Sequence, residues 1–76
     1  MKVVKSKQAK KYIESQDQQT QDRLNAAINK LPEGDVVPIT GMPDTFRLRV
    51  GKYRALFIKE NDMIKVTVIN TRGQIY

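Results

Sequence analysis

The residues of this chain that are best suited to chemistry are arginines, and four of its five arginines fall between Arg47 and Arg72. A guanidinium group presents its N–H donors in a planar fork that matches two oxygens of a phosphate group. The sequence has no cysteine and no histidine, which argues against a zinc site and removes most pairs of nucleophile and base. The sequence therefore predicts phosphate binding and electrostatic stabilisation, with no metal and no cofactor.

Composition predicts a single small, basic domain over residues 1–76. Lysine and arginine number 14 against 8 aspartate and glutamate residues, which gives a net charge of +6. Such an excess favours a polyanionic partner, either nucleic acid or an acidic protein segment. No apolar run approaches the roughly 20 residues that span a bilayer, and the N-terminus lacks the apolar stretch of a signal peptide. We expect a cytoplasmic protein with no membrane partner.

The first half of the chain has the pattern of one strand followed by two helices. Residues 1–5 are short enough for an opening strand, and Ser6 can cap the helix that follows it. A second helix begins near Ser15 or Asp17, both of which are candidate caps. This helix is predicted to end at Pro32, after an apolar stripe formed by Leu24, Ala27, Ile28 and Leu31.

The second half of the chain changes to the period of two that is typical of strands. Residues 33–44 are loop-like, with at most a short edge segment at residues 36–39, because Pro38 argues against a central strand. Three strands then follow, joined by the two-residue turns Gly51-Lys52 and Asn61-Asp62. The expected fold is α+β, in the order β-α-α-β-β-β, with an antiparallel sheet and the helical hairpin packed on one face.

The two tight turns fix a register that brings arginines together. Counting back from Gly51-Lys52 places Arg49 directly opposite Arg54. The predicted core face then collects Phe46, Leu48, Val50, Ala55, Phe57, Ile64, Val66 and Val68. The opposite, uncovered face collects Arg47, Arg49, Arg54, Leu56, Ile58, Lys65, Thr67 and Ile69. Opposed like charges destabilise a sheet, and an apolar floor beside them is typical of a binding surface, so we predict an anion-binding face.

In three segments, residues 41–44, 46–54 and 70–76, the sequence resembles the signature of the RelE/ParE toxin superfamily. Residues 41–44 (Gly-Met-Pro-Asp) match its glycine turn, and residues 46–54 (Phe-Arg-Leu-Arg-Val-Gly-Lys-Tyr-Arg) match its basic strand, its turn and the Tyr-Arg pair that opens the next strand. Residues 70–76 (Asn-Thr-Arg-Gly-Gln-Ile-Tyr) resemble its close, in which an arginine precedes a near-terminal tyrosine. The resemblance implies a RelE-like toxin of a type II toxin–antitoxin system.

RelE-like toxins cleave messenger RNA on the ribosome without a metal, with the ribose 2′-hydroxyl as nucleophile. The resemblance implies that Arg54 stabilises the charge of the transition state, that Arg72 assists the leaving oxygen, and that Tyr76 stacks on or orients the scissile nucleotide. It also implies three partners for the chain, namely a cognate acidic antitoxin, the ribosome and messenger RNA.

The remaining basic residues of the signature are assigned to RNA binding. Arg47 and Arg49 stand where RelE itself usually has lysine, and we group them with Lys52. An arginine keeps its charge and cannot serve as the base that a desolvated lysine can become. Two alternatives therefore stay open beside the endonuclease. One is a ParE-like inhibitor of DNA gyrase, and the other is an inactive relative that only binds its antitoxin.

Overall fold

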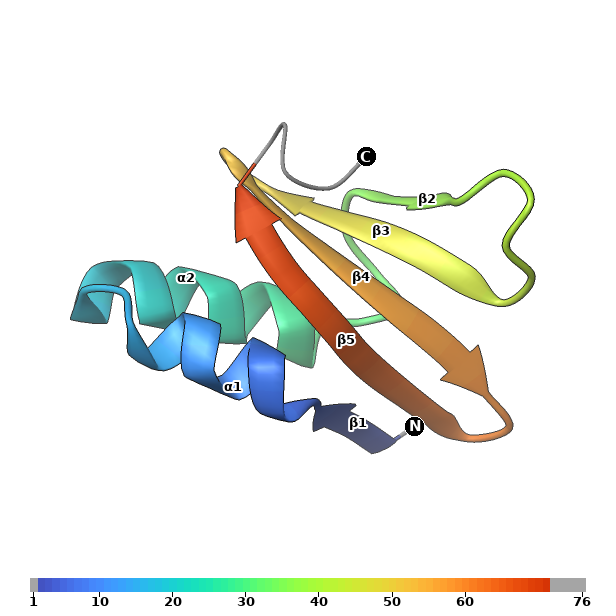
Figure 1. Ribbon diagram of the computed structural model, residues 1–76, viewed down its shortest axis with the longest axis horizontal. Coiled ribbons are helices and arrows are strands. Elements are labelled where there is room, and N and C mark those ends of the chain that lie inside the picture. The colour runs from blue at the N-terminus through green and yellow to red at the C-terminus, as the bar shows by residue number, and fades with distance from the viewer. Residues whose placement is uncertain (1, 72–76) are drawn as a thin grey trace.

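The computed structural model describes residues 2–71, which form two helices and five strands. The strands are β1 (Lys2–Lys5), β2 (Val36–Pro38), β3 (Thr45–Val50), β4 (Tyr53–Glu60) and β5 (Met63–Thr71). The helices are α1 (Lys7–Glu14) and α2 (Gln18–Asn29). All five strands belong to one sheet in the order β1-β5-β4-β3-β2, in which β1 runs parallel to β5 and the other neighbours are antiparallel (Figure 1).

The predicted fold, a β-α-α-β-β-β order with an antiparallel sheet, is wrong. The sheet is mixed and has a further strand, β2, which pairs with β3. Pro38 does not prevent this strand, because β2 lies at the edge of the sheet, where a missing N–H group breaks no inner ladder. Hydrogen bonds from Lys2 N to Asp62 O (2.8 Å) and from Ser6 N to Val66 O (2.8 Å) bracket β1 alongside β5. Hairpin turns alone could not have revealed this parallel pairing.

Side-chain caps begin both helices. Ser6 Oγ accepts a hydrogen bond from Ala9 N (3.1 Å), and Asp17 Oδ1 accepts one from Thr20 N (2.8 Å). Asp17 is therefore the cap of α2, whereas Ser15 ends α1. The hydrogen bonds from Thr20 hold the pKa of the Asp17 carboxyl group below its ordinary value. Neither helix in the described part of the chain is long and apolar enough to cross a membrane.

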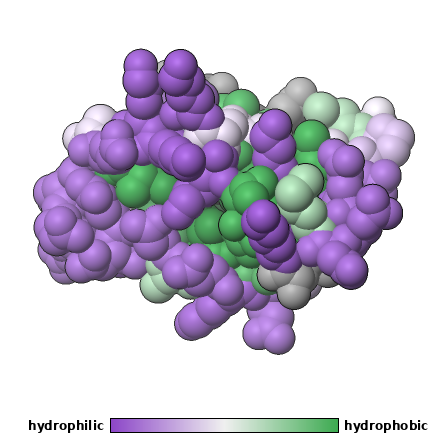
Figure 2. Space-filling view, turned by 90° about the horizontal axis from the view of Figure 1, so that it is seen from below, coloured by the Kyte–Doolittle hydropathy of each residue, from purple (hydrophilic) through white to green (hydrophobic). Residues whose placement is uncertain are grey.

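Both helices lie on one side of the sheet and bury the core there (Figure 1). The surface seen from below that view is mainly hydrophilic, with hydrophobic side chains gathered near its middle (Figure 2). The seven largest fully buried side chains come from α2 and from three strands: Phe57, Leu24, Ile28, Leu48, Ile64, Ile69 and Val66. Phe57 stacks on Phe46 with ring centroids 5.4 Å apart. Because one face of the sheet packs in this core, the opposite face of each strand is left to contact other molecules.

The predicted register holds across β3 and β4 and fails in the second half of β5. Arg49 pairs with Arg54 and Phe57 with Val66, as predicted, but Ala55 faces Ile69 where Val68 was expected. The pairing shifts between Leu56 and Phe57, which leaves Thr67 as an extra residue in β5. Such a bulge exchanges the two faces beyond it. Ile69 is accordingly in the core, fully buried, and the prediction that it lies on the uncovered face is wrong.

Side chains of α1 and of its cap Ser6 cover the edge of β5 where β1 ends. Ser6 Oγ donates to Thr67 O at 2.6 Å. The side-chain amide of Gln8 bonds both backbone groups of Ile69, since its Nε2 donates to the carbonyl (3.1 Å) and its Oε1 accepts from the N–H (3.0 Å). Gln8 thus takes the place of a neighbouring strand at an edge that would otherwise invite pairing with another chain.

Replacing Gln8 by alanine should lower the free energy of unfolding by about 1 kcal/mol, because two hydrogen bonds to the β5 backbone are lost. Urea denaturation would measure this change. Gln19→Ala is the matched control, since Gln19 is exposed on α2 and its loss should change stability by less than about 0.5 kcal/mol. Equal effects of the two substitutions would show that Gln8 does not secure this edge.

The bulge predicts different costs for two adjacent truncations. Ile69→Ala removes a fully buried side chain and should destabilise by about 3 kcal/mol, whereas Val68→Ala, at a half-buried position on the other face, should cost about 1 kcal/mol. Chemical denaturation of both variants would show which substitution lowers the free energy of unfolding more. If Val68→Ala proved the more damaging, the unbroken alternation would be right and the bulge wrong.

Candidate anion-binding face

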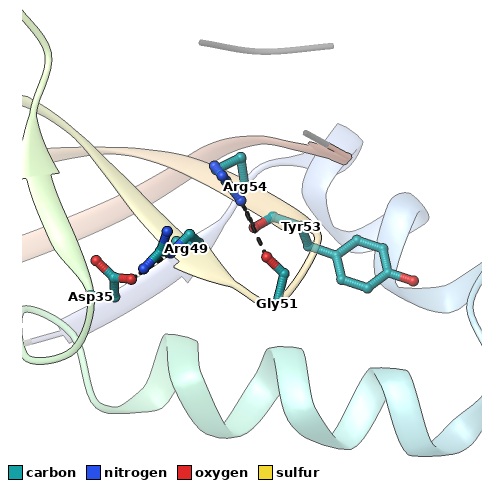
Figure 3. A network of polar contacts seen from close by, with 5 residues as sticks. All are labelled: Asp35, Arg49, Gly51, Tyr53 and Arg54. Carbon is teal, nitrogen blue, oxygen red and sulfur yellow. Dashed lines mark hydrogen bonds and ion pairs between the residues drawn. The ribbon is translucent and has the colours of Figure 1, made fainter. Parts of the chain in front are cut away.

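The predicted arginines belong to the face of the sheet opposite the helices, here called the outer face. It is formed by Arg47, Arg49, Arg54, Leu56, Ile58, Lys65 and Val68, together with Val37 of β2. Arg49 and Arg54 are cross-strand partners, and Arg47 pairs with Leu56. Figure 3 shows Arg54 on the side of the sheet away from α2. The structure therefore places Arg47, Arg49 and Arg54 on adjoining positions of two neighbouring strands.

Arg54 is buried, with only 7% of its surface exposed. Its Nη1 donates to the carbonyl oxygens of Gly51 and Tyr53, each at 3.3 Å (Figure 3). A buried charge is costly unless it has hydrogen-bond partners, and the carbonyls of its own hairpin supply two. Arg54 therefore ties the start of β4 to the β3–β4 turn, a structural role that the sequence did not predict.

Arg49 is exposed and held by a carboxylate that sequence reasoning missed. Its Nε donates to Asp35 Oδ2 at 2.6 Å, with the two side chains 55% and 47% exposed. Its backbone N–H also donates to Asp35 O at 2.9 Å, which extends the β2–β3 ladder by one residue. Pairing β2 with β3 and counting back from Val36 would have found Asp35, but no turn or motif in the sequence sets the register of this edge strand.

The guanidinium groups of Arg49 and Arg54 thus bind different acceptors although their strand positions face each other (Figure 3). Arg49 is drawn toward Asp35, and Arg54 toward the carbonyls of the turn. This division relieves the repulsion that the predicted register implied. It also means that the two guanidinium groups do not share one common acceptor.

An apolar floor lies beside the arginines. Leu56 is 9% exposed, Ile58 and Val68 are half-buried, and Val37 is 37% exposed. Val37, Arg47, Leu56 and Val68 form one row across the four strands from β2 to β5. The prediction that Val68 lies on the core face is wrong, because Val68 pairs with Leu56 on the outer face. The floor is therefore continuous with the half-buried Arg47.

Lys52 is not brought together with the arginines of the outer face. Its Nζ lies 5.5 Å from the centroid of the Tyr53 ring, and the Tyr53 hydroxyl donates to Gln16 Oε1 (3.2 Å), beside the helices. The charge of Lys52 also contributes to the lowered pKa of Asp17, the cap of α2. Lys52 thus lies on the helix side of the β3–β4 turn.

The other predicted site residues, Arg72 and Tyr76, lie outside the described residues 2–71. Within that range no cluster of three or more His, Cys, Asp or Glu side chains could hold a metal ion. The guanidinium groups of the outer face can orient an anion and neutralise its charge.

Comparison with known proteins finds likeness at the level of structure. No protein-family model and no curated protein matches the sequence. A chain of the archaeal RelE–RelB complex from Pyrococcus horikoshii OT3 superimposes with a TM-score of 0.78 at 23% identity, covering 96% of both chains. A chain of the RelB–RelE antitoxin–toxin complex from Methanococcus jannaschii gives 0.79 at 21% identity, covering 96% of this chain and 94% of that one. The fold of this protein is therefore one found in RelE–RelB complexes.

Proposed function

We propose that this chain is the toxin of a type II toxin–antitoxin pair, a metal-independent endonuclease that cleaves messenger RNA on the ribosome. The observation that carries the proposal is the group Arg47, Arg49 and Arg54 on adjoining strands, in a fold shared with chains of RelE–RelB complexes. That fold likeness alone suits either partner of such a complex. The net charge of +6 favours the toxin, because lysine and arginine that neutralise phosphates supply affinity for RNA.

The proposed reaction is transfer of the RNA phosphate to the neighbouring ribose. The 2′-oxygen bonds to phosphorus as its proton leaves, and the bond from phosphorus to the 5′-oxygen breaks as that oxygen gains a proton. The products are a 2′,3′-cyclic phosphate and a 5′-hydroxyl group. In this scheme Arg47 and Arg49 hold the phosphate, and Arg54 stabilises the negative charge of the transition state.

Two parts of the scheme depend on residues that the described structure does not position for catalysis. By their resemblance to the superfamily, Arg72 assists the leaving oxygen and Tyr76 stacks on the scissile nucleotide. Arg54 is 7% exposed, so its direct contact with a phosphate requires a local rearrangement when RNA binds. An arginine in such a low-dielectric setting interacts more strongly with a nearby charge than an exposed one does.

The same face suits an acidic antitoxin segment. Leu56, Ile58 and Val68 offer an apolar floor, Val37 extends it to the sheet edge, and Arg47 supplies positive charge within it. A segment with alternating apolar and acidic residues would bury the floor and pair with the arginines. Such segments commonly fold as they bind. The antitoxin would thereby also stabilise a domain whose size limits the core that it can bury.

The proposal predicts that Arg54→Lys lowers cleavage of ribosome-bound messenger RNA by roughly 100-fold, because a lysine cannot reproduce the fork that stabilises the transition state. A purified translation system would report the cleavage, and analysis of the RNA ends would identify the 2′,3′-cyclic phosphate. Lys65→Gln is the control, since it removes one exposed charge of the same face at the far end of β5. Thermal unfolding of both variants would verify that they fold.

Full activity of Arg54→Lys would remove Arg54 from the site. Absence of cleavage by the unaltered protein would contradict the endonuclease itself. In that case loss of DNA supercoiling by gyrase would identify a gyrase inhibitor. Tight binding to an acidic antitoxin, with neither activity, would identify a binding module. The last outcome has support from the resemblance, since Arg47 and Arg49 stand where RelE itself usually has lysine, which can lose a proton.

A further inference from the structure

A pocket of about 360 Å³ lies beside β3, between that strand and α2. Its floor is apolar, with Ala26 and Ala27 on one side and Leu48 and Val50 on the other. The pocket is also lined by three cationic residues, Arg23, Lys30 and Arg49, and by two acidic ones, Glu33 and Asp35. The volume is in the range of pockets that bind small molecules or single groups of a larger ligand, and the charged residues leave an excess of positive charge.

Arg23 connects this pocket to the turn that carries the outer-face arginines. Gly51, in that turn, has φ +58°, and a Cβ atom built on it would lie only 2.9 Å from Nη2 of Arg23. The guanidinium group of Arg23 therefore lies directly over the glycine of the turn. Arg23 is otherwise exposed on α2, so its charge is available at the mouth of the pocket.

Arg49 belongs to both the outer face and the pocket. Its backbone pairs with Arg54 and its side chain belongs to the outer face, while the residue also lines the pocket at the edge of β3. The ion pair with Asp35 uses Nε of Arg49, and among the described residues no hydrogen bond engages its two terminal amino groups. Asp35 thus fixes the fork at the strand edge and leaves its outer end for a ligand (Figure 3).

We propose that this pocket is a second phosphate-binding site, in which Arg23, Lys30 and Arg49 bind a phosphate of the same single-stranded RNA that crosses the outer face. The inference rests on the proposed function, because Arg49 is the residue shared by the two surfaces. The RNA would pass over the edge of β3 next to Asp35, between the outer face and α2. Arg23, which sequence analysis did not select, becomes a binding residue.

The excess positive charge of the pocket can be cancelled by one substitution at an exposed helix position. Ala26 lines the pocket from an exposed position on α2, where glutamate and glutamine are both good helix formers. Ala26→Glu and Ala26→Gln differ in charge alone. Binding of a fluorescent single-stranded oligoribonucleotide to the full chain, measured by anisotropy over a range of salt concentrations, should be several-fold weaker for Ala26→Glu than for Ala26→Gln.

Arg23→Gln gives the second arm of the test. Each phosphate contact with single-stranded nucleic acid contributes about 0.7 to the slope of log affinity against log salt concentration. Arg23→Gln should therefore reduce the slope by about 0.7, and Arg23→Lys should keep it. Lys7→Gln, which removes one exposed charge from α1, should leave the slope within error of the unaltered protein.

The outcomes separate this inference from the function on which it rests. If Arg23→Gln matches Lys7→Gln, and Ala26→Glu matches Ala26→Gln, while Arg47→Gln weakens binding, the second site is wrong and the outer face stands. If Arg47→Gln has no effect either, the proposed RNA-binding function fails with it. If Arg23→Gln does not fold, the Ala26 pair decides the question.

Discussion

The pairing of β3 with β4 through a two-residue turn is the constraint on which the rest of this structure depends. Gly51 adopts φ +58°, and Val50 pairs with Tyr53 directly after it. The first position of such a turn needs a positive φ, which glycine adopts without strain. A slip of one residue would carry Arg49 into the core and Leu48 out of it. One glycine thus decides that the arginines of two strands share a face.

This constraint brings Arg49 and Arg54 together, and each of the two guanidinium groups binds a different partner. Arg54 turns to the carbonyls of its own hairpin, while Arg49 turns to Asp35 at the sheet edge. An exposed ion pair such as the second contributes at most about 1 kcal/mol to stability. Its main effect is therefore geometric, because it moves one guanidinium group away from the other. The face stays cationic, and it is divided into a buried position and an exposed one.

What the sequence could predict follows from local patterns. Both helix caps were among the predicted candidates, and the register of β3 with β4 was right because short turns transmit register directly. The mixed topology was not predictable in this way, since β1 joins β5 across most of the chain. The bulge at Thr67 inserts one residue into the alternation of inner-face and outer-face residues along β5. The amino-acid composition does not indicate it. Asp35 and Arg23 were missed because their roles appear only once β2 and α2 are placed beside β3.

The row Val37, Arg47, Leu56 and Val68 has a consequence for how a partner would regulate the proposed activity. Cross-strand neighbours in a sheet lie close enough for one bound segment to touch them all. A segment that buries the three apolar residues must therefore also cover Arg47, which lies among them. Inhibition would then need no change of fold, because the proposed antitoxin segment and RNA would compete for the same arginine. The pocket beside β3 lies outside this row. RNA contacts made in the pocket would therefore remain when an antitoxin segment covers the apolar floor.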